Sequence, residues 1–289
     1  MILQRSVVAL AFMALGGQAL GVLGLAGNAY GAEIEIERMT WTEIRDAVAA
    51  GHTTVLIPTG GTEQNGPHMV LGKHNFIVAE TARRIATRLG DALVAPVLGY
   101  VPEGDIASRQ GHMGYAGTIS LTPETFSAIL TETAASFRAH GFKTIVFIGE
   151  HGASIDPQTT VATGLSQAWS ADGIRVINAS NYYGGNGGAE WLKGQGETAA
   201  AIGRHATIQD TSELLSVFPA GVRMDKRVAD KDGVVGDPTR ATAERGQKLI
   251  ELKVDAAVAE IEAARKGAVV TAGQPERGFF GRIWRWFFG

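Results

Sequence analysis

Short apolar runs alternate along this chain with longer segments that carry apolar residues at helical spacing. Apolar runs bounded by glycine, proline or polar residues predict buried strands at residues 53–58, 92–98, 143–148 and 174–178. Apolar positions three and four residues apart predict helices at residues 75–89, 122–140, 157–170, 210–218 and 241–266. Such alternation is typical of a parallel sheet covered on both faces. We therefore predict an α/β fold with three layers, α/β/α, around a mostly parallel sheet.

The first 32 residues have a different character from the rest. They carry one charge, Arg5, then an apolar run from Ser6 to about Gly27 and small residues, before the acidic Glu33. This layout is typical of a cleavable export signal. We expect cleavage near residues 29–32 and a periplasmic location. A permanent transmembrane anchor is the alternative, because roughly 20 apolar residues can span a bilayer. The predicted folded domain is then residues 33–270.

A C-terminal tail, residues 271–289, is the second atypical segment. Its end reads G-F-F-G-R-I-W-R-W-F-F-G, so aromatic residues alternate with arginines. A basic and aromatic segment is typical of contact with a membrane surface, which would run through Phe279, Phe288 and the residues between them. Docking of the tail on its own domain or on a neighbouring subunit is the alternative.

Composition narrows the possible chemistry. The 289 residues include no cysteine, which excludes disulfides, zinc–thiolate sites, iron–sulfur ligation and cysteine nucleophiles. Any metal must be bound by His, Asp, Glu or backbone oxygen. The formal net charge is -3, which indicates no basic face for nucleic acid, so we expect no nucleic-acid partner.

Histidines gather where the predicted strands end. Of the seven in the chain, five lie in loops after predicted strands or at a helix start: His68, His74, His112, His151 and His205. Ligands bind at the carboxyl ends of the strands in open parallel sheets. Glu63 shares a glycine-rich loop with two of these histidines, and Glu150 precedes another. The positions favour a metal or catalytic site, although a hydrogen-bonded loop histidine is the alternative for each residue taken alone.

Four segments, in order, resemble the creatininase (creatinine amidohydrolase) family. The stretch I-P-T-G-G-T-E-Q-N-G-P-H-M-V-L-G-K-H is similar to the family signature P-x-G-x-x-E-Q-H-G-P-H-L-P-L-G-T-D. H-M-G-Y-A-G-T-I-S-L, G-F-K-T-I-V-F-I-G-E-H-G-A-S and H-A-T-I-Q-D-T-S resemble the later family motifs. The resemblance implies a creatininase-like α/β fold, a homo-oligomer and metal-dependent hydrolysis of a non-peptide C–N bond. Its substrate would be a small molecule such as a cyclic amide or a formamide.

The family's metal ligands carry over only in part. The family glutamate is present as Glu63, and its strand-end histidine as His151. Asn65 stands where the family has a histidine, and His74 stands where it has a bridging aspartate. The resemblance therefore implies a divergent form of a site that usually holds two metals.

Further departures point to a single metal. Ala153 and Ile208 occupy positions where some members of the family have additional carboxylates. A set of two histidines and one carboxylate suits one Zn, Mn or Fe ion with open positions. We therefore expect one divalent ion per chain, bound by Glu63, His74 and His151, and an empty second position.

The candidate residues that are not expected to bind the metal are expected to assist hydrolysis by a metal-activated water. We expect His205, which matches a family histidine, to transfer protons, and Glu150 to be a second candidate base. Residues expected to line the pocket or orient ligands are Asn65, His68, His112 and Thr118. Two alternatives stay open: a catalytically inactive creatininase-fold protein that binds a small molecule, and a metal-dependent lactonase or isomerase.

Overall fold

The computed structural model describes residues 33–267. The predicted signal peptide, residues 1–32, and the predicted tail, residues 271–289, lie outside the described residues. In the part that is described, no helix is both long enough and apolar enough to cross a membrane.

A parallel sheet forms the middle layer. Within residues 33–267 it has four strands, in the order β2-β1-β3-β4. Their bounds are β1 Thr54–Thr59, β2 Ala92–Val94, β3 Thr144–Gly149 and β4 Arg175–Asn178. The two central strands pair over their full length, from Thr54 opposite Thr144 to Thr59 opposite Gly149, and both are buried throughout. Continuous burial explains why these strands read as apolar runs rather than as alternating patterns.

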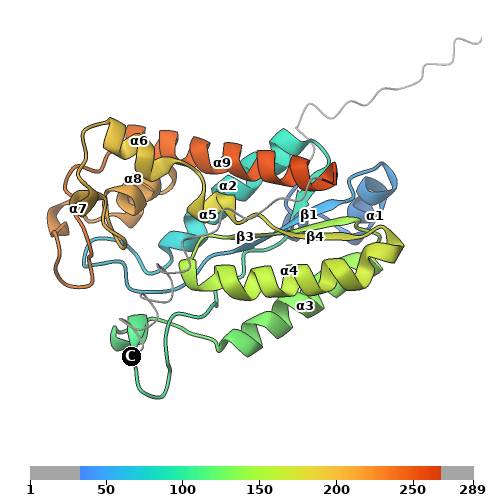
Figure 1. The fold of residues 1–289 in the computed structure, drawn as a ribbon, viewed down its shortest axis with the longest axis horizontal. Helices are drawn as coiled ribbons and strands as arrows, with labels where there is room; N and C mark the ends of the chain where they lie inside the picture. Colours follow the sequence, from blue (N-terminus) through green and yellow to red (C-terminus); the bar gives the residue numbers. More distant parts are fainter. Residues whose placement is uncertain (1–32, 268–289) are drawn as a thin grey trace, which may run out of the picture. The chain divides into compact units, whose positions relative to one another are not determined.

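Helices cover both faces of the sheet (Figure 1). On one face Val55 and Phe147 pack against α3, Pro123–Ala139, and α4, Ile155–Trp169. On the other face Leu56, Val146 and Ile148 pack against two further helices. These are α2, Lys73–Leu89, and α9, Ala243–Arg265. Side chains alternate between the two faces along each strand, so one strand contributes to both cores. The predicted three-layer α/β/α fold is confirmed.

Smaller helices complete the domain. They are α1 Trp41–Ala49, α5 Asn181–Gly184, α6 Gly188–Gly194, α7 Ala199–Ile202 and α8 Ile208–Val217. The sequence pattern predicted α8 but not the other four. Helix α1 begins with a capping box between Thr40 and Glu43, a local signal that could have identified it.

The second strand is shorter than predicted. It ends at Val94 rather than near residue 98. The chain nevertheless continues beside β1, because Ala95 N donates to Leu56 O at 2.9 Å and Leu98 N donates to Pro58 O at 2.9 Å. This path delivers the following segment, residues 99–121, to the carboxyl end of the sheet.

Candidate metal centre

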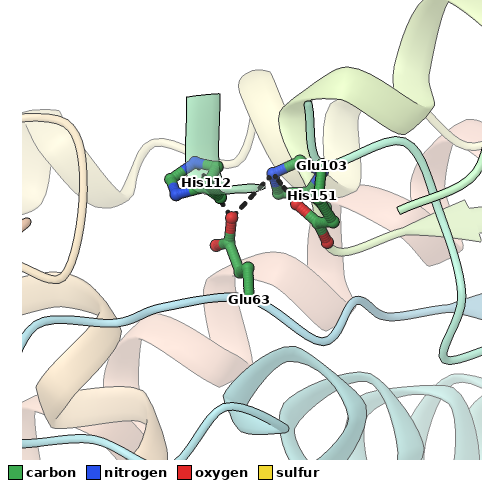
Figure 2. Close-up of side chains that lie close together, drawn as sticks. All are labelled: Glu63, Glu103, His112 and His151. Atoms are coloured by element: carbon green, nitrogen blue, oxygen red, sulfur yellow. Dashed lines mark ion pairs between the residues drawn. The ribbon is translucent and has the colours of Figure 1, made fainter. Parts of the chain in front are cut away.

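Four side chains from three segments converge beyond the carboxyl ends of the strands (Figure 2). Glu63 lies in the loop after β1, and His151 follows β3. Glu103 and His112 come from the segment between β2 and α3, with His112 in the short 3-10 helix Gly111–Gly114. Parallel strands end at the same edge of a sheet, which explains how residues so distant in sequence meet.

Glu63 is the centre of this group, and its side chain is fully buried. Its Oε2 lies 2.9 Å from His112 Nε2 and 3.3 Å from His151 Nε2. Its Oε1 lies 2.7 Å from His74 Nε2 and 3.8 Å from His205 Nδ1. Burial alone would raise the pKa of Glu63, but the facing imidazoles outweigh it and hold this pKa well below its usual range. Four of the five histidines singled out by the sequence therefore surround one carboxylate.

Glu103 is the functional candidate that the sequence reasoning missed. Its side chain is buried, and Oε2 lies 3.1 Å from His151 Nε2. Within residues 33–267, neither of its oxygens meets a partner with hydrogen-bond geometry. Burial, followed by the nearby charge of Glu63, raises the pKa of Glu103 well above its usual range. Its position just past the second predicted strand was the signal that could have identified it.

The donor atoms of these four residues fit a divalent metal ion. One ligand atom from each residue lies within 4.8 Å of the ligand atoms of the other three. Imidazole nitrogen and carboxylate oxygen are the ligand types that Zn, Mn and Fe accept in a site without thiolates. A buried carboxylate without a donor, such as Glu103, is also the kind of group that a bound cation stabilises.

His74 lies beside this group rather than within it. Its Nε2 is 2.7 Å from Glu63 Oε1, whereas His112 and His151 meet the other oxygen, Oε2. Burial lowers the pKa of His74 to about 3, so the imidazole is neutral at pH 7. Since an ionised carboxylate only accepts hydrogen bonds, the Nε2–H of His74 donates to Glu63. The expected ligand role of His74 would require this hydrogen bond to be exchanged for a metal bond.

His205 reaches the site from the loop before α8. Its Nε2 lies 2.9 Å from the backbone oxygen of Gln64, and its ring centroid is 4.5 Å from that of His112. Burial lowers the pKa of His205 to about 4, so this imidazole is also neutral at pH 7. The side-chain Nε2 of Gln64 lies 3.0 Å from His205 Nε2, and His205 Nδ1 faces Glu63. The structure therefore places His205 beside Glu63, with one ring nitrogen held at the Gln64 backbone.

Glu150 does not occupy the position expected of a second base. Lys253 Nζ lies 2.6 Å from its Oε1, and the Tyr182 hydroxyl donates to its Oε2. Glu213 Oε2 is also 2.6 Å from Lys253 Nζ, which makes a buried cluster of two carboxylates and one ammonium. Both oxygens of Glu150 already have partners from α5 and α9, so the geometry does not support the base role.

The other expected pocket residues shape the loop that carries Glu63. Asn65 Nδ2 donates to the backbone oxygen of Glu63 at 2.9 Å, and Gln64 N donates to Thr118 Oγ1 at 3.2 Å. His68 is bonded instead to Thr211 on α8, with 2.9 Å between Nε2 and Oγ1. Among the predicted pocket residues, only His112 belongs to the group of four.

Comparison with known proteins agrees with this architecture. The sequence model of the creatininase family, described as creatinine amidohydrolase, matches residues 37–261. The mycofactocin precursor peptide peptidase of Mycobacterium tuberculosis is 28% identical over 238 residues, which cover 72% of this chain and 84% of that protein. The creatinine amidohydrolase of Pseudomonas putida is 30% identical over 116 residues, covering 40% of this chain and 44% of that protein.

Solved structures show the same fold. A structure described as creatininase Mn superposes with a TM-score of 0.67 at 22% identity, covering 82% of this chain and 99% of that one. A creatininase mutant described as Zn-Zn type gives a TM-score of 0.65 at 22% identity, with 82% of this chain covered and 99% of the other.

Proposed function

The chain belongs to the creatininase family, and from this premise we propose that it hydrolyses an amide C–N bond of a small molecule with one divalent metal ion. The observation that carries the proposal is the environment of Glu63. A fully buried carboxylate with four histidines around it, at the ligand end of a parallel sheet, suits a metal site far better than a structural core.

The group at the carboxyl ends of the strands would hold the ion, with Glu63 and His151 as the family-derived ligands and His112 beside them. When bound, a divalent ion supplies a Lewis acid that polarises a carbonyl and lowers the pKa of water. The metals given in the descriptions of two related structures, Mn and Zn, are both compatible with these donors. Fe is the third metal that this donor set allows.

His205 is the proposed proton acceptor and donor. Its neutral imidazole presents Nδ1 toward Glu63 at 3.8 Å, while Nε2 is held between the backbone oxygen and the side-chain amide of Gln64. A neutral histidine of fixed orientation can take a proton at Nδ1 and return it to the leaving nitrogen, which is the requirement for hydrolysing an amide. Thr118 and Asn65 keep the Glu63 loop in place through their hydrogen bonds.

The substrate class follows from the relatives. We propose a cyclic amide or a formamide-like compound, in line with the relative named creatinine amidohydrolase. A peptide amide is the second candidate, favoured by the more extensive match to a relative named as a peptide peptidase. Both are amide bonds, so the same site would serve either.

The test is a turnover assay on the full chain, loaded in turn with Zn, Mn and Fe. Cyclic amides, formamides, short peptides and lactones would be incubated with it, and products identified by mass spectrometry. Glu63→Ala should lower turnover by more than about 100-fold, because even outer partners of a metal site account for about 10–100-fold. Glu80→Gln, a change in a half-buried ion pair on α2, is the control.

Three results would contradict the proposal. Turnover that survives in Glu63→Ala would remove the metal site from the reaction. Ligand binding without turnover in any metal-loaded form would favour an inactive binding protein. Hydrolysis of lactones with no hydrolysis of amides would assign a different bond.

Export and assembly extend the proposal. The pattern of residues 1–32 supports a periplasmic hydrolase, and the family resemblance supports a homo-oligomer. Intact-mass measurement of protein from a periplasmic fraction should find an N-terminus near residues 30–33. A cytoplasmic, uncut chain would contradict the export proposal, and a monomer in light scattering would contradict the oligomer.

A further inference from the structure

Glu103 lies in a place that is costly for a carboxyl group without a partner. Only 1% of the residue is exposed, and in the part of the chain that the structure describes neither oxygen accepts a well-formed hydrogen bond; the nearest cationic partner is His151, whose Nε2 lies 3.1 Å from Oε2. Buried polar groups are nearly always paired with a donor, an ordered water or an ion. A buried carboxyl that lacks a well-formed hydrogen bond and lies beside a cluster of imidazoles therefore indicates a missing ligand.

The backbone around Glu103 holds this side chain toward the site. Glu103 N donates to Ser120 Oγ at 3.0 Å, and Glu103 O accepts from His112 N at 3.1 Å. Leu121 N donates to Val101 O at 3.1 Å, which closes the base of the same segment. The carboxylate is thus placed by a hydrogen-bonded framework, and the same framework connects it to His112.

A glycine makes room for the carboxylate. A Cβ added to Gly61, in the loop that carries Glu63, would lie 2.4 Å from Glu103 Oε1. Any side chain at position 61 would therefore push Glu103 out of its position. The loop after β1 accommodates Glu103 beside Glu63, and the two carboxylates share His151, whose Nε2 lies 3.3 Å from Glu63 and 3.1 Å from Glu103.

Nearby cations do not balance these carboxylates. Lys73, at the start of α2, directs its Nζ to Asp210 at 2.7 Å. Lys253 directs its Nζ to the cluster behind His151, at Glu150 and Glu213. A divalent ion between Glu63, Glu103 and the two histidines would supply the positive charge that the cluster lacks.

Glu103 also offers a candidate metal ligand in a chain where ligands of the resembled family are replaced. Asn65, His74 and Ala153 stand at positions where the resembled family has a metal-ligating side chain. We propose that Glu103 is a metal ligand and that this chain builds its site from Glu63, Glu103, His112 and His151. This inference rests on the proposed metal-dependent function, and it replaces the ligand set Glu63, His74 and His151 expected from the sequence.

The test measures metal binding directly. Metal-free full-length protein would be titrated with Mn and with Zn by calorimetry, and the Mn-loaded form examined by electron paramagnetic resonance. Glu103→Gln keeps the shape of the side chain and removes its charge, and we expect it to weaken metal binding by at least about 100-fold. His74→Gln should weaken binding by less than Glu103→Gln. The matched control is Glu260→Gln, which changes another buried carboxyl whose oxygens accept from Ser180 and Asn181.

Stability without metal separates ligand loss from misfolding. Metal-free Glu103→Gln should unfold at the same temperature as the metal-free wild type or higher, since the amide has the shape of the carboxyl and cannot become a buried charge. A variant that binds metal like Glu260→Gln would overturn the inference, even if its turnover fell, because Glu103 would then act on substrate or protons. A wild-type protein that binds no metal would overturn the proposed function as well, which distinguishes the two failures.

Discussion

Replacing Lys253 by methionine is the sharpest test of how the fold supports the end of β3. Lys253 Nζ lies 2.6 Å from both Glu150 and Glu213, and the three side chains are 3%, 3% and 2% exposed. Glu150 immediately precedes His151, so this cluster ties α8 and α9 to the loop that carries a proposed ligand. Methionine preserves most of the volume of the lysine stem and removes the charge.

The expected loss of stability is large because two carboxylates would remain buried without their cation. Removing one partner of a buried ion pair costs about 3–5 kcal/mol. For a domain of this size, each kcal/mol shifts the midpoint of thermal unfolding by about 2–4 °C, so we expect a fall of roughly 6–20 °C. Adding Glu213→Gln to Lys253→Met should recover part of this loss, because it removes one of the two uncompensated charges.

The assay is chemical and thermal unfolding of metal-free protein at pH 8, followed by circular dichroism. Lys248→Met is the matched control on the same helix, since that side chain is 42% exposed and its Nζ lies 3.7 Å from Glu251. We expect the control to change stability by less than about 0.5 kcal/mol. If Lys253→Met were no less stable than Lys248→Met, the argument from buried charge would be refuted.

Three further predictions concern packing, capping and pH. Burial raises the pKa of Glu213 to about 7, so its contribution to stability is full below pH 4.5 and is lost as the pH rises through 7. Urea titrations should therefore show that the free energy of unfolding of the wild type falls by roughly 3 kcal/mol between pH 4.5 and 8, relative to that of Glu213→Gln. Unfolding free energies that change with pH in the same way in both proteins would contradict this. Gly246→Ala on α9 would place a Cβ 1.8 Å from Ser212 O on α8. This clash should lower the free energy of unfolding by about 1–3 kcal/mol. A variant as stable as the wild type would show that α8 and α9 can move apart without cost. Thr207→Ala removes the cap of α8 and should cost about 1 kcal/mol, whereas Thr207→Ser should retain the cap, so equal losses in both variants would exclude capping as the cause.

Much of the fold could be predicted because its central strands are buried on both faces. Such strands appear as uninterrupted apolar runs, as in residues 144–149, and their flanking helices carry clear apolar spacing. The short helices were harder to predict. Helix α6 lies in a glycine-rich stretch with no periodic pattern, and its formation depends on contacts of Leu192 with distant residues such as Leu249.

The candidate site could be predicted where a motif or a strand end marked it. Glu63, His112, His151 and His205 all had such a mark, and the structure brings them together. Glu103 carried no motif, and its approach to His151 depends on hydrogen bonds made by the 101–121 segment. The partners of Glu150 could not be predicted, because the sequence does not reveal that Lys253, about a hundred residues later, pairs with it.

The proposed hydrolysis requires a metal ion at the Glu63 group. The decisive measurement is the metal content per chain of the full-length protein, determined by elemental mass spectrometry after loading with Zn or Mn and removal of free ion. We expect one ion per chain in the wild type and in Glu80→Gln, and none in Glu63→Ala or His151→Ala. No bound ion in the wild type, or an ion that persists in Glu63→Ala, would contradict the account, and two ions per chain would contradict the single-metal site.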